Sequence, residues 1–190
     1  MESYEIDIPL VVKWVLNEKA SKVLVQAPGG IKPHLKELLD SLFKITNVYI
    51  SGSHAWGGCD IALREADALG VKHIIHIGHH GPVRVRVPRD FKVLFIPAFA
   101  KVEIIDVLER EMGKLGDYTP VGLLASLQHV NQLNNVKKSL EKRGYKVLIG
   151  AGNLPYLGQI IGCDVSAATS IANRVNCCLL YTSPSPRDRG

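Results

Sequence analysis

Residues 22–60 of the chain read KVLVQAPGGIKPHLKELLDSLFKITNVYISGSHAWGGCD. Two short runs rich in β-branched residues, 23–26 and 48–51, flank an amphipathic stretch over about 33–43. Two strands joined by a crossover helix are typical of a parallel sheet covered by helices. A glycine-rich loop follows the second strand and ends in GGCD at 57–60. The segment therefore predicts a βαβ unit with a cysteine beyond its second strand.

The same alternation of strands and helices continues along the chain, so we predict an α/β fold of parallel sheets flanked by helices. The expected strands cover 22–26, 47–51, 73–77, 93–97, 121–127 and 146–150. The expected helices cover about 9–17, 33–43, 59–69, 102–115, 131–143 and 163–175.

The βαβ unit is expected to occur twice. The second copy has strands that start at 121 and 147, which are 26 residues apart, against 25 for the strands that start at 23 and 48. Its loop ends in Gly-Cys-Asp at 162–164, as the first ends in Gly-Cys-Asp at 58–60. Chance similarity of two ordinary βαβ units is the alternative. We predict tandem pseudo-repeated domains over 1–116 and 117–177, with a linker near 116–120.

Residues 178–190 read CLLYTSPSPRDRG and differ in composition from the rest of the chain. This serine-, proline- and arginine-rich string resembles the read-through of a sequencing adaptor, and a natural flexible tail is the alternative. We expect the native sequence to end between Asn176 and Tyr181. Cys177 to Tyr181 also has the apolar character of a strand that has been cut short.

The composition is that of a soluble globular protein, with 190 residues, 46% hydrophobic and 22% charged. No apolar run approaches the roughly 20 residues of a membrane-spanning helix, and the N-terminus lacks a secretory signal, so a cytoplasmic location without membrane contact is expected. The net charge of +5 suits acidic partners. No cluster of basic and aromatic residues indicates direct binding of nucleic acid.

Four cysteines, of which Cys177 and Cys178 are adjacent, form a poor disulfide framework, and thiols in a reducing compartment more often serve metals or catalysis. Cys59 and Cys163 take matching places where a loop is expected to become a helix. A helix N-terminus favours the thiolate that binds metals, and flanking glycines let a bulky ligand approach. The aspartates that follow the two cysteines are expected to cap these helices.

The absence of a Cys-x-x-Cys pair argues against structural zinc. A plain buried cysteine is the alternative for either thiol. We predict that Cys59 and Cys163 are ligands of one iron–sulphur cluster, because a cluster held by one cysteine from each of several domains needs no local spacing. A third repeat would supply a third thiolate and leave one iron of a 4Fe-4S cluster open to substrate.

The segments SGSHAWGGCD at 51–60, HIGH at 76–79 and GQIIGC at 158–163 resemble the archaeal radical enzymes of diphthamide synthesis, over residues from about 5 to 177. The resemblance implies three related domains, the third missing here, that share a 4Fe-4S cluster in a homodimer. It implies that reduction by an electron donor cleaves bound S-adenosylmethionine. The 3-amino-3-carboxypropyl radical then adds to a histidine of translation elongation factor 2, leaving methylthioadenosine. Without the third cysteine, the chain alone is expected to be inactive.

Further residues are candidates for binding the substrate because they lie at expected strand ends or beside the cysteines, although turns, core aromatics and histidines bonded to the backbone are the alternatives. These candidates are Gln26, Gly30, Gly57, Gly58, His79, Gln128, His129 and Gln159, with His76 beside them and Trp56 and Tyr156 as shields of the cluster. Two other functions stay open: a quinolinate synthase-like dehydrating enzyme with a 4Fe-4S cluster, and a non-catalytic partner subunit of the same fold.

Overall fold

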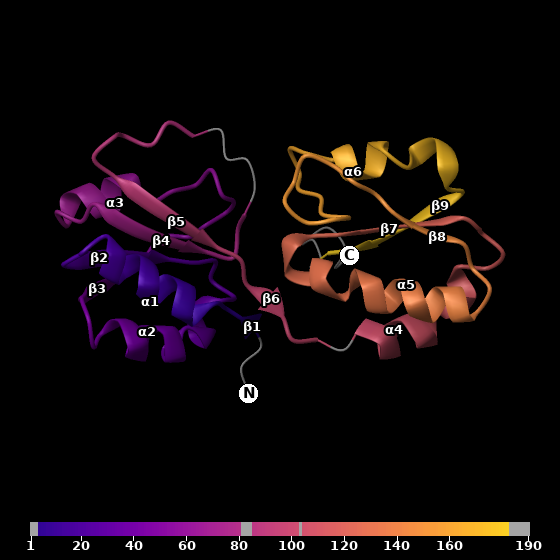
Figure 1. Ribbon diagram of the computed structural model, residues 1–190, viewed down its shortest axis with the longest axis horizontal. Coiled ribbons are helices and arrows are strands. Elements are labelled where there is room, and N and C mark those ends of the chain that lie inside the picture. Colours follow the sequence, from indigo (N-terminus) through magenta and orange to yellow (C-terminus); the bar gives the residue numbers. More distant parts are fainter. Residues whose placement is uncertain (1–3, 81–84, 103, 183–190) are drawn as a thin grey trace. The chain divides into compact units, whose positions relative to one another are not determined.

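The computed structural model describes residues 4–80, 85–102 and 104–182 (Figure 1). The chain forms two compact units, Met1–Ala98 and Phe99–Gly190. Each unit is built on a parallel sheet with helices on both faces, so the predicted α/β class is confirmed. The longest helices in the described ranges have 10 residues, and none of them is long and apolar enough to cross a membrane.

The first unit has a four-stranded parallel sheet in the order β3-β2-β4-β5. Its strands are β2 (Lys22–Gln26), β3 (Asn47–Ile50), β4 (His73–Ile77) and β5 (Lys92–Ile96), and β1 (Tyr4–Glu5) opens the unit. Its helices are α1 (Ile8–Asn17), the 3₁₀ turn η1 (Lys32–His34), α2 (Lys36–Leu42) and α3 (Leu63–Ala68). The predicted strands agree with these bounds to within one residue at each end.

Alternate residues of β2 fill two apolar layers, as expected for a strand buried on both faces. Val23 and Val25 pack with the apolar side of α1 and α2, whereas Leu24 packs with α3. Figure 1 shows α1 and α2 on one face of the sheet and α3 on the other. Helices thus cover both faces of the sheet, and β2 and β4 are its central strands. The carboxyl ends of these two strands are therefore held in place by the packed core.

The second unit has a three-stranded parallel sheet in the order β8-β7-β9. Its strands are β7 (Val121–Ala125), β8 (Val147–Ile149) and β9 (Cys177–Tyr181), after a short β6 (Phe99–Ala100). Its helices are α4 (Ile104–Glu111), α5 (Leu133–Lys142) and α6 (Ser166–Thr169), with 3₁₀ turns η2 (Met112–Lys114), η3 (Leu127–Gln132) and η4 (Ala172–Arg174). Helices α4 and α5 share the core on one face, and α6 covers the other (Figure 1).

The two units share a strand arrangement. Lys22 pairs with Asn47 in the first, and Val121 pairs with Val147 in the second, so the repeat spacing of 25 and 26 residues is the register of the first two strands. In the first sheet β3 lies on one side of β2 and β4 lies on the other. In the second sheet β8 lies on one side of β7 and β9 lies on the other. The similarity predicted from the sequence therefore extends to topology, while the number of such repeats stays a prediction.

Three predicted boundaries differ from the structure. The chain divides at Ala98 and not near Gly116, because Ile104 and Leu108 of α4 lie in the core of the second unit. The helices expected at 59–69 and 163–175 are much shorter, at α3 and α6. The strand β9 pairs with β7 along its whole length through Tyr181, so the fold continues beyond the predicted end at 177. Residues 183–190 of the predicted foreign tail lie outside the described residues.

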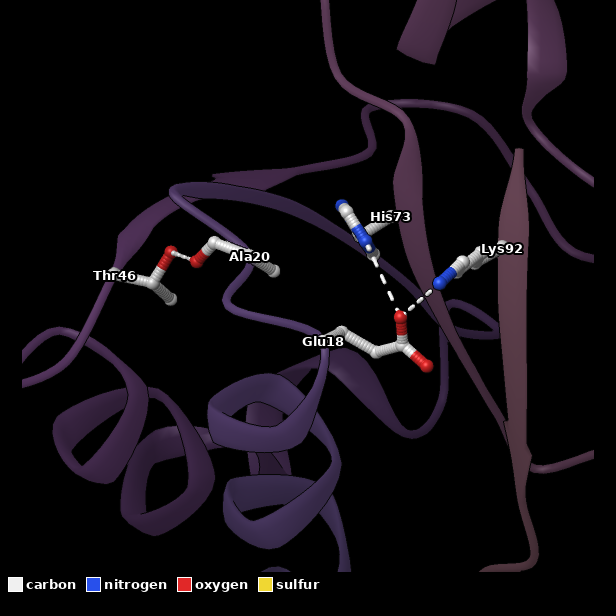
Figure 2. A network of polar contacts seen from close by, with 5 residues as sticks. All are labelled: Glu18, Ala20, Thr46, His73 and Lys92. Atoms are coloured by element: carbon white, nitrogen blue, oxygen red, sulfur yellow. Dashed lines mark hydrogen bonds and ion pairs between the residues drawn. The ribbon is translucent and has the colours of Figure 1, made fainter. Parts of the chain in front are cut away.

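Polar contacts tie the elements together at the amino edge of the first sheet (Figure 2). Glu18, which follows α1, accepts a hydrogen bond from Lys92 at the start of β5 and lies 4.0 Å from Nε2 of His73 at the start of β4. Thr46 Oγ1 donates to Ala20 O over 2.7 Å. These contacts stabilise the amino edge of the sheet. The cysteine loop lies at the opposite, carboxyl edge, where open α/β sheets bind ligands.

Candidate functional site

Cys59 lies in the loop that joins β3 to α3, at the carboxyl edge of the first sheet. Because β3 and β4 lie on opposite sides of β2, the chain changes direction across the sheet at this point, and such switch points are where open α/β sheets bind ligands. The thiol is free and exposed. A Cβ built on Gly57 would lie 3.7 Å from Cys59 Sγ, so glycine leaves this flank of the thiol open.

The start of the loop is held by two charged side chains from neighbouring elements. Lys32 Nζ donates to the carbonyl oxygens of Ser51 and Ser53, over 2.8 and 2.7 Å. Glu65 of α3 accepts from Ser51 Oγ over 2.6 Å and from Gly52 N over 3.0 Å. Lys32 and Glu65 were not among the predicted site residues, because nothing in the local sequence pattern separates them from ordinary surface charges.

The end of the loop is held by Gln26, the last residue of β2, whose side chain is only 1% exposed. Gln26 Nε2 donates to Asp60 O over 2.7 Å, and Gln26 Oε1 accepts from Ala62 N over 2.9 Å. Asp60 Oδ2 in turn accepts from Trp56 N over 3.0 Å. Cys59 therefore projects from a turn whose backbone is fixed on both sides.

Two histidines continue this network into the sheet. His76 Nδ1 lies 3.1 Å from Gln26 Oε1, and His76 Nε2 lies 2.9 Å from His79 Nδ1. Burial, together with the neighbouring His79, lowers the pKa of His76 to about 4. Burial also lowers the pKa of His79. Both rings are therefore neutral near pH 7, which suits hydrogen bonding more than charge.

Cys163 takes the matching place in the second unit, in the loop between β8 and α6, and its thiol is also free and exposed. The loop returns to β7 through Gln159, which bridges to Ala125 and is 1% exposed. Asp164 Oδ1 then accepts from Ser166 N over 2.9 Å. A Cβ built on Gly162 would meet no atom within 4 Å. The glycine before this cysteine is therefore not crowded by other parts of the described chain.

The expected helix N-termini at the cysteines are not found. Cys59 precedes the first residue of α3 by four positions, and Cys163 precedes that of α6 by three. The helix charge therefore does not account for their chemistry, and hydrogen bonds of the loops fix their positions instead. The predicted cap is wrong for Asp60, which closes a turn with Trp56, whereas Asp164 does bond to the first residue of α6.

The remaining candidates fall at three places. Gly30 is exposed beyond β2, Gly57 and Gly58 are half-buried beside Cys59, and Gln128 and His129 are half-buried in η3 beyond β7. His129 Nδ1 and Ser126 Oγ are buried atoms without a hydrogen-bond partner among the described residues. Trp56 is 82% exposed and contacts His54 with the two rings tilted and their centroids 5.1 Å apart, whereas Tyr156 is half-buried against Phe99.

Within the described ranges, no group of three or more histidine, cysteine, aspartate or glutamate side chains could hold a metal ion. Each unit offers one exposed thiol in a fixed loop, and thiolate is the donor that iron–sulphur clusters take. Cys177 and Cys178 are adjacent in β9, so their side chains point to opposite faces of the sheet. That Cys59 and Cys163 share one cluster stays a prediction.

The chain as a whole is similar to known proteins of one family. The family model described as putative diphthamide synthesis protein matches residues 27–187. The chain is 33% identical over 171 residues to the 2-(3-amino-3-carboxypropyl)histidine synthase of Pyrococcus horikoshii, covering 87% of this chain and 48% of that protein. It is 25% identical over 164 residues to subunit 1 of the human synthase, covering 85% of this chain and 37% of that protein.

Among solved structures, Dph2 from Pyrococcus horikoshii with a 4Fe-4S cluster superposes with a TM-score of 0.79 and 30% identity. The superposition covers 96% of this chain and 53% of that one. The chain thus spans about half the length of its archaeal relative. Both units therefore share the fold of the superposed part of that protein.

Proposed function

The chain belongs to the diphthamide synthesis family, and we propose that it forms part of a 2-(3-amino-3-carboxypropyl)histidine synthase. The proposed reaction moves the 3-amino-3-carboxypropyl group of S-adenosylmethionine to a histidine of translation elongation factor 2. One electron breaks the bond from sulphur to this group, a bond to the imidazole ring forms, and the ring then loses a proton and gives one electron back. Methylthioadenosine is the second product.

One observation carries the proposal: two free, exposed cysteines lie in matching Gly-Cys-Asp loops beyond the second strand of each unit. The similar Dph2 of Pyrococcus horikoshii has a 4Fe-4S cluster. Cys59 and Cys163 would hold two irons of such a cluster, and both thiols are exposed, with no atom within 4 Å of a Cβ built on Gly162. When bound, the cluster would supply the electron and the open iron needed to cleave S-adenosylmethionine.

The other residues of the loops would act by positioning. The backbone on both sides of Cys59 is fixed by Lys32, Glu65 and Gln26. The loop therefore already has an ordered conformation before a cofactor binds. A preorganised ligand loop lowers the entropy cost of binding a cofactor. His79, Gly30, Gln128 and His129 lie beyond central strands of the two sheets and remain candidates for contact with the substrate.

We infer the wider organisation from the same family. A third related domain would supply the third cysteine, and the assembled enzyme would be a cytoplasmic homodimer served by an electron donor. Its protein substrate would be translation elongation factor 2. The quinolinate synthase-like alternative and the non-catalytic subunit predict no transfer of the aminocarboxypropyl group, and no feature of the loops favours either.

A chimera tests this function. Residues 4–182 of this chain replace the matching segment of the Pyrococcus horikoshii synthase, and the chimera is loaded with iron and sulphide without oxygen. We expect the reduced protein to form methylthioadenosine and to add one 3-amino-3-carboxypropyl group to elongation factor 2, seen by mass spectrometry. The intact archaeal synthase is the positive control. A chimera that binds iron but forms no methylthioadenosine would exclude the proposal.

A further inference from the structure

Gln26 uses every hydrogen-bonding position of its side chain within the chain. Its Nε2 donates to the carbonyl oxygens of Asp60 and His54, over 2.7 and 3.5 Å. Its Oε1 accepts from Ala62 N over 2.9 Å and lies 3.1 Å from His76 Nδ1. A primary amide has two N–H donors and two acceptor lone pairs, so none is left for a substrate.

We propose that Gln26 is a positioning residue of the Cys59 loop and that the same side chain fixes where the protons of His76 and His79 lie. The inference rests on the proposed function only in taking Cys59 to be a cluster ligand. It replaces the expectation that Gln26 binds substrate.

The positions of the protons follow from the neighbours of the amide. The oxygen of Gln26 must face Ala62 N–H, because an N–H group needs an acceptor. This same oxygen can only accept from His76, so His76 carries its proton on Nδ1. His76 Nε2 is then an acceptor, and His79 must donate to it from Nδ1. His79 Nε2 is left with a lone pair, which can accept a hydrogen bond from an N–H or O–H group of the substrate.

Burial makes this arrangement costly to break. Gln26 is 1% exposed and His76 is fully buried, so water cannot replace a lost partner for either side chain. The lowered pKa of both histidines supports neutral rings, which the one-proton pattern requires. In this relay of hydrogen bonds, His79 donates to His76, His76 donates to Gln26, and Gln26 donates to Asp60 O in the cysteine loop.

The proton positions can be read directly from the wild-type chain. Long-range proton–nitrogen correlation spectra of the histidine rings distinguish a proton on Nδ1 from one on Nε2. We expect the Nδ1–H form for both His76 and His79 near pH 7. A His76 ring with its proton on Nε2 would overturn the proposal, and this measurement needs no variant, iron or S-adenosylmethionine.

Two substitutions separate positioning from packing. Gln26→Met keeps the volume but removes all four bonds, so amide exchange at Ala62 should rise about tenfold or more and the Nδ1–H preference of His76 should be lost. Gln26→Glu keeps an acceptor for His76 Nδ1–H but loses the donors to Asp60 O and His54 O, so it should keep the Nδ1–H preference of His76 while amide exchange at Ala62 still rises. Gln132→Met removes a similar bond to Ala100 O in the other unit and is the control.

If Ala62 and His76 in Gln26→Met match the wild type, the positioning role is wrong. If the proton positions hold but the chimera forms no methylthioadenosine, the relay stands and the proposed function fails. The two hypotheses are therefore tested independently of each other.

Discussion

Ser51 and Glu65 close the base of the cysteine loop: Ser51 Oγ donates a hydrogen bond to Glu65 Oε2 over 2.6 Å, across 14 positions of sequence. Ser51 is 1% exposed, and Glu65 also accepts from the backbone of Gly52. Glu65 therefore does more for the loop than an exposed carboxylate on a helix would do.

We predict that Glu65→Ala lowers the free energy of unfolding by about 1–3 kcal/mol, because it leaves a buried hydroxyl without its partner. Urea denaturation followed by circular dichroism measures the change. Glu111→Ala, which removes an exposed ion pair with Lys114, should leave the unfolding midpoint nearly unchanged. Equal effects of the two substitutions would show that the Ser51 contact contributes no more than a surface pair.

The central strands β2 and β4 were predictable because each is a short run rich in β-branched residues that is buried on both faces. Residues 22–26 and 73–77 were predicted with the bounds that the structure has. The start of α3 was not, because the loop before it is held by Gln26, which is 34 positions from its partner Asp60. No local pattern contains such a bond.

The candidate site divides in the same way. The two cysteines could be found from the repeat, which is a property of sequence alone. Lys32 and Glu65 act through contacts with Ser51 that exist only after β3 and α3 have folded. The unit boundary was misplaced for a related reason, since the amphipathic pattern of α4 shows that it packs but not against which core.

The cysteine ligands give a second prediction, made in the chimera described above. Cys59→Ser and Cys163→Ser should each reduce the cluster absorbance and lower methylthioadenosine formation by more than the roughly 10- to 100-fold loss typical of outer-shell partners of a metal. Cys178→Ser is the matched control, because this thiol is also exposed but lies in β9. Full iron loading in either ligand variant would contradict the assignment.

Acid should destabilise the first unit through His76. Its ring titrates near 6.5 in the unfolded chain and at about 4 in the folded one, where burial disfavours the charge. The stability due to the neutral ring is complete above pH 6.5 and is lost as the pH falls from 6.5 toward 4, because the unfolded chain then binds the extra proton. The loss approaches roughly 3 kcal/mol.

The groups around the ring of His76 are Gln26, His79, Phe95 and, at longer range, Asp60. Unfolding free energies of the wild type and His76→Gln, measured from pH 7 to pH 4, should converge as the pH falls. The histidines that do not contact His76 contribute alike to both proteins and cancel in the difference, and only His79 changes its surroundings with the substitution. Parallel curves would mean that His76 titrates alike in both states.

The outer edge of β9 is expected to drive association of the isolated chain. β9 pairs with β7 on one side, and the described residues place no strand on its other side. Leu180 of β9 is 47% exposed, and an open edge with apolar side chains invites pairing with another copy. Sedimentation velocity in the presence of reductant should therefore show larger species that grow with concentration.

Leu180→Lys should reduce this association, because a charge on an edge strand disfavours pairing with an identical strand. Leu10→Lys is the matched control: Leu10 is 45% exposed but lies on a helix, α1, and not on an edge strand. If both substitutions act alike, association comes from general apolar surface. If the wild-type chain stays monodisperse over the whole concentration range, the edge of β9 does not mediate self-association.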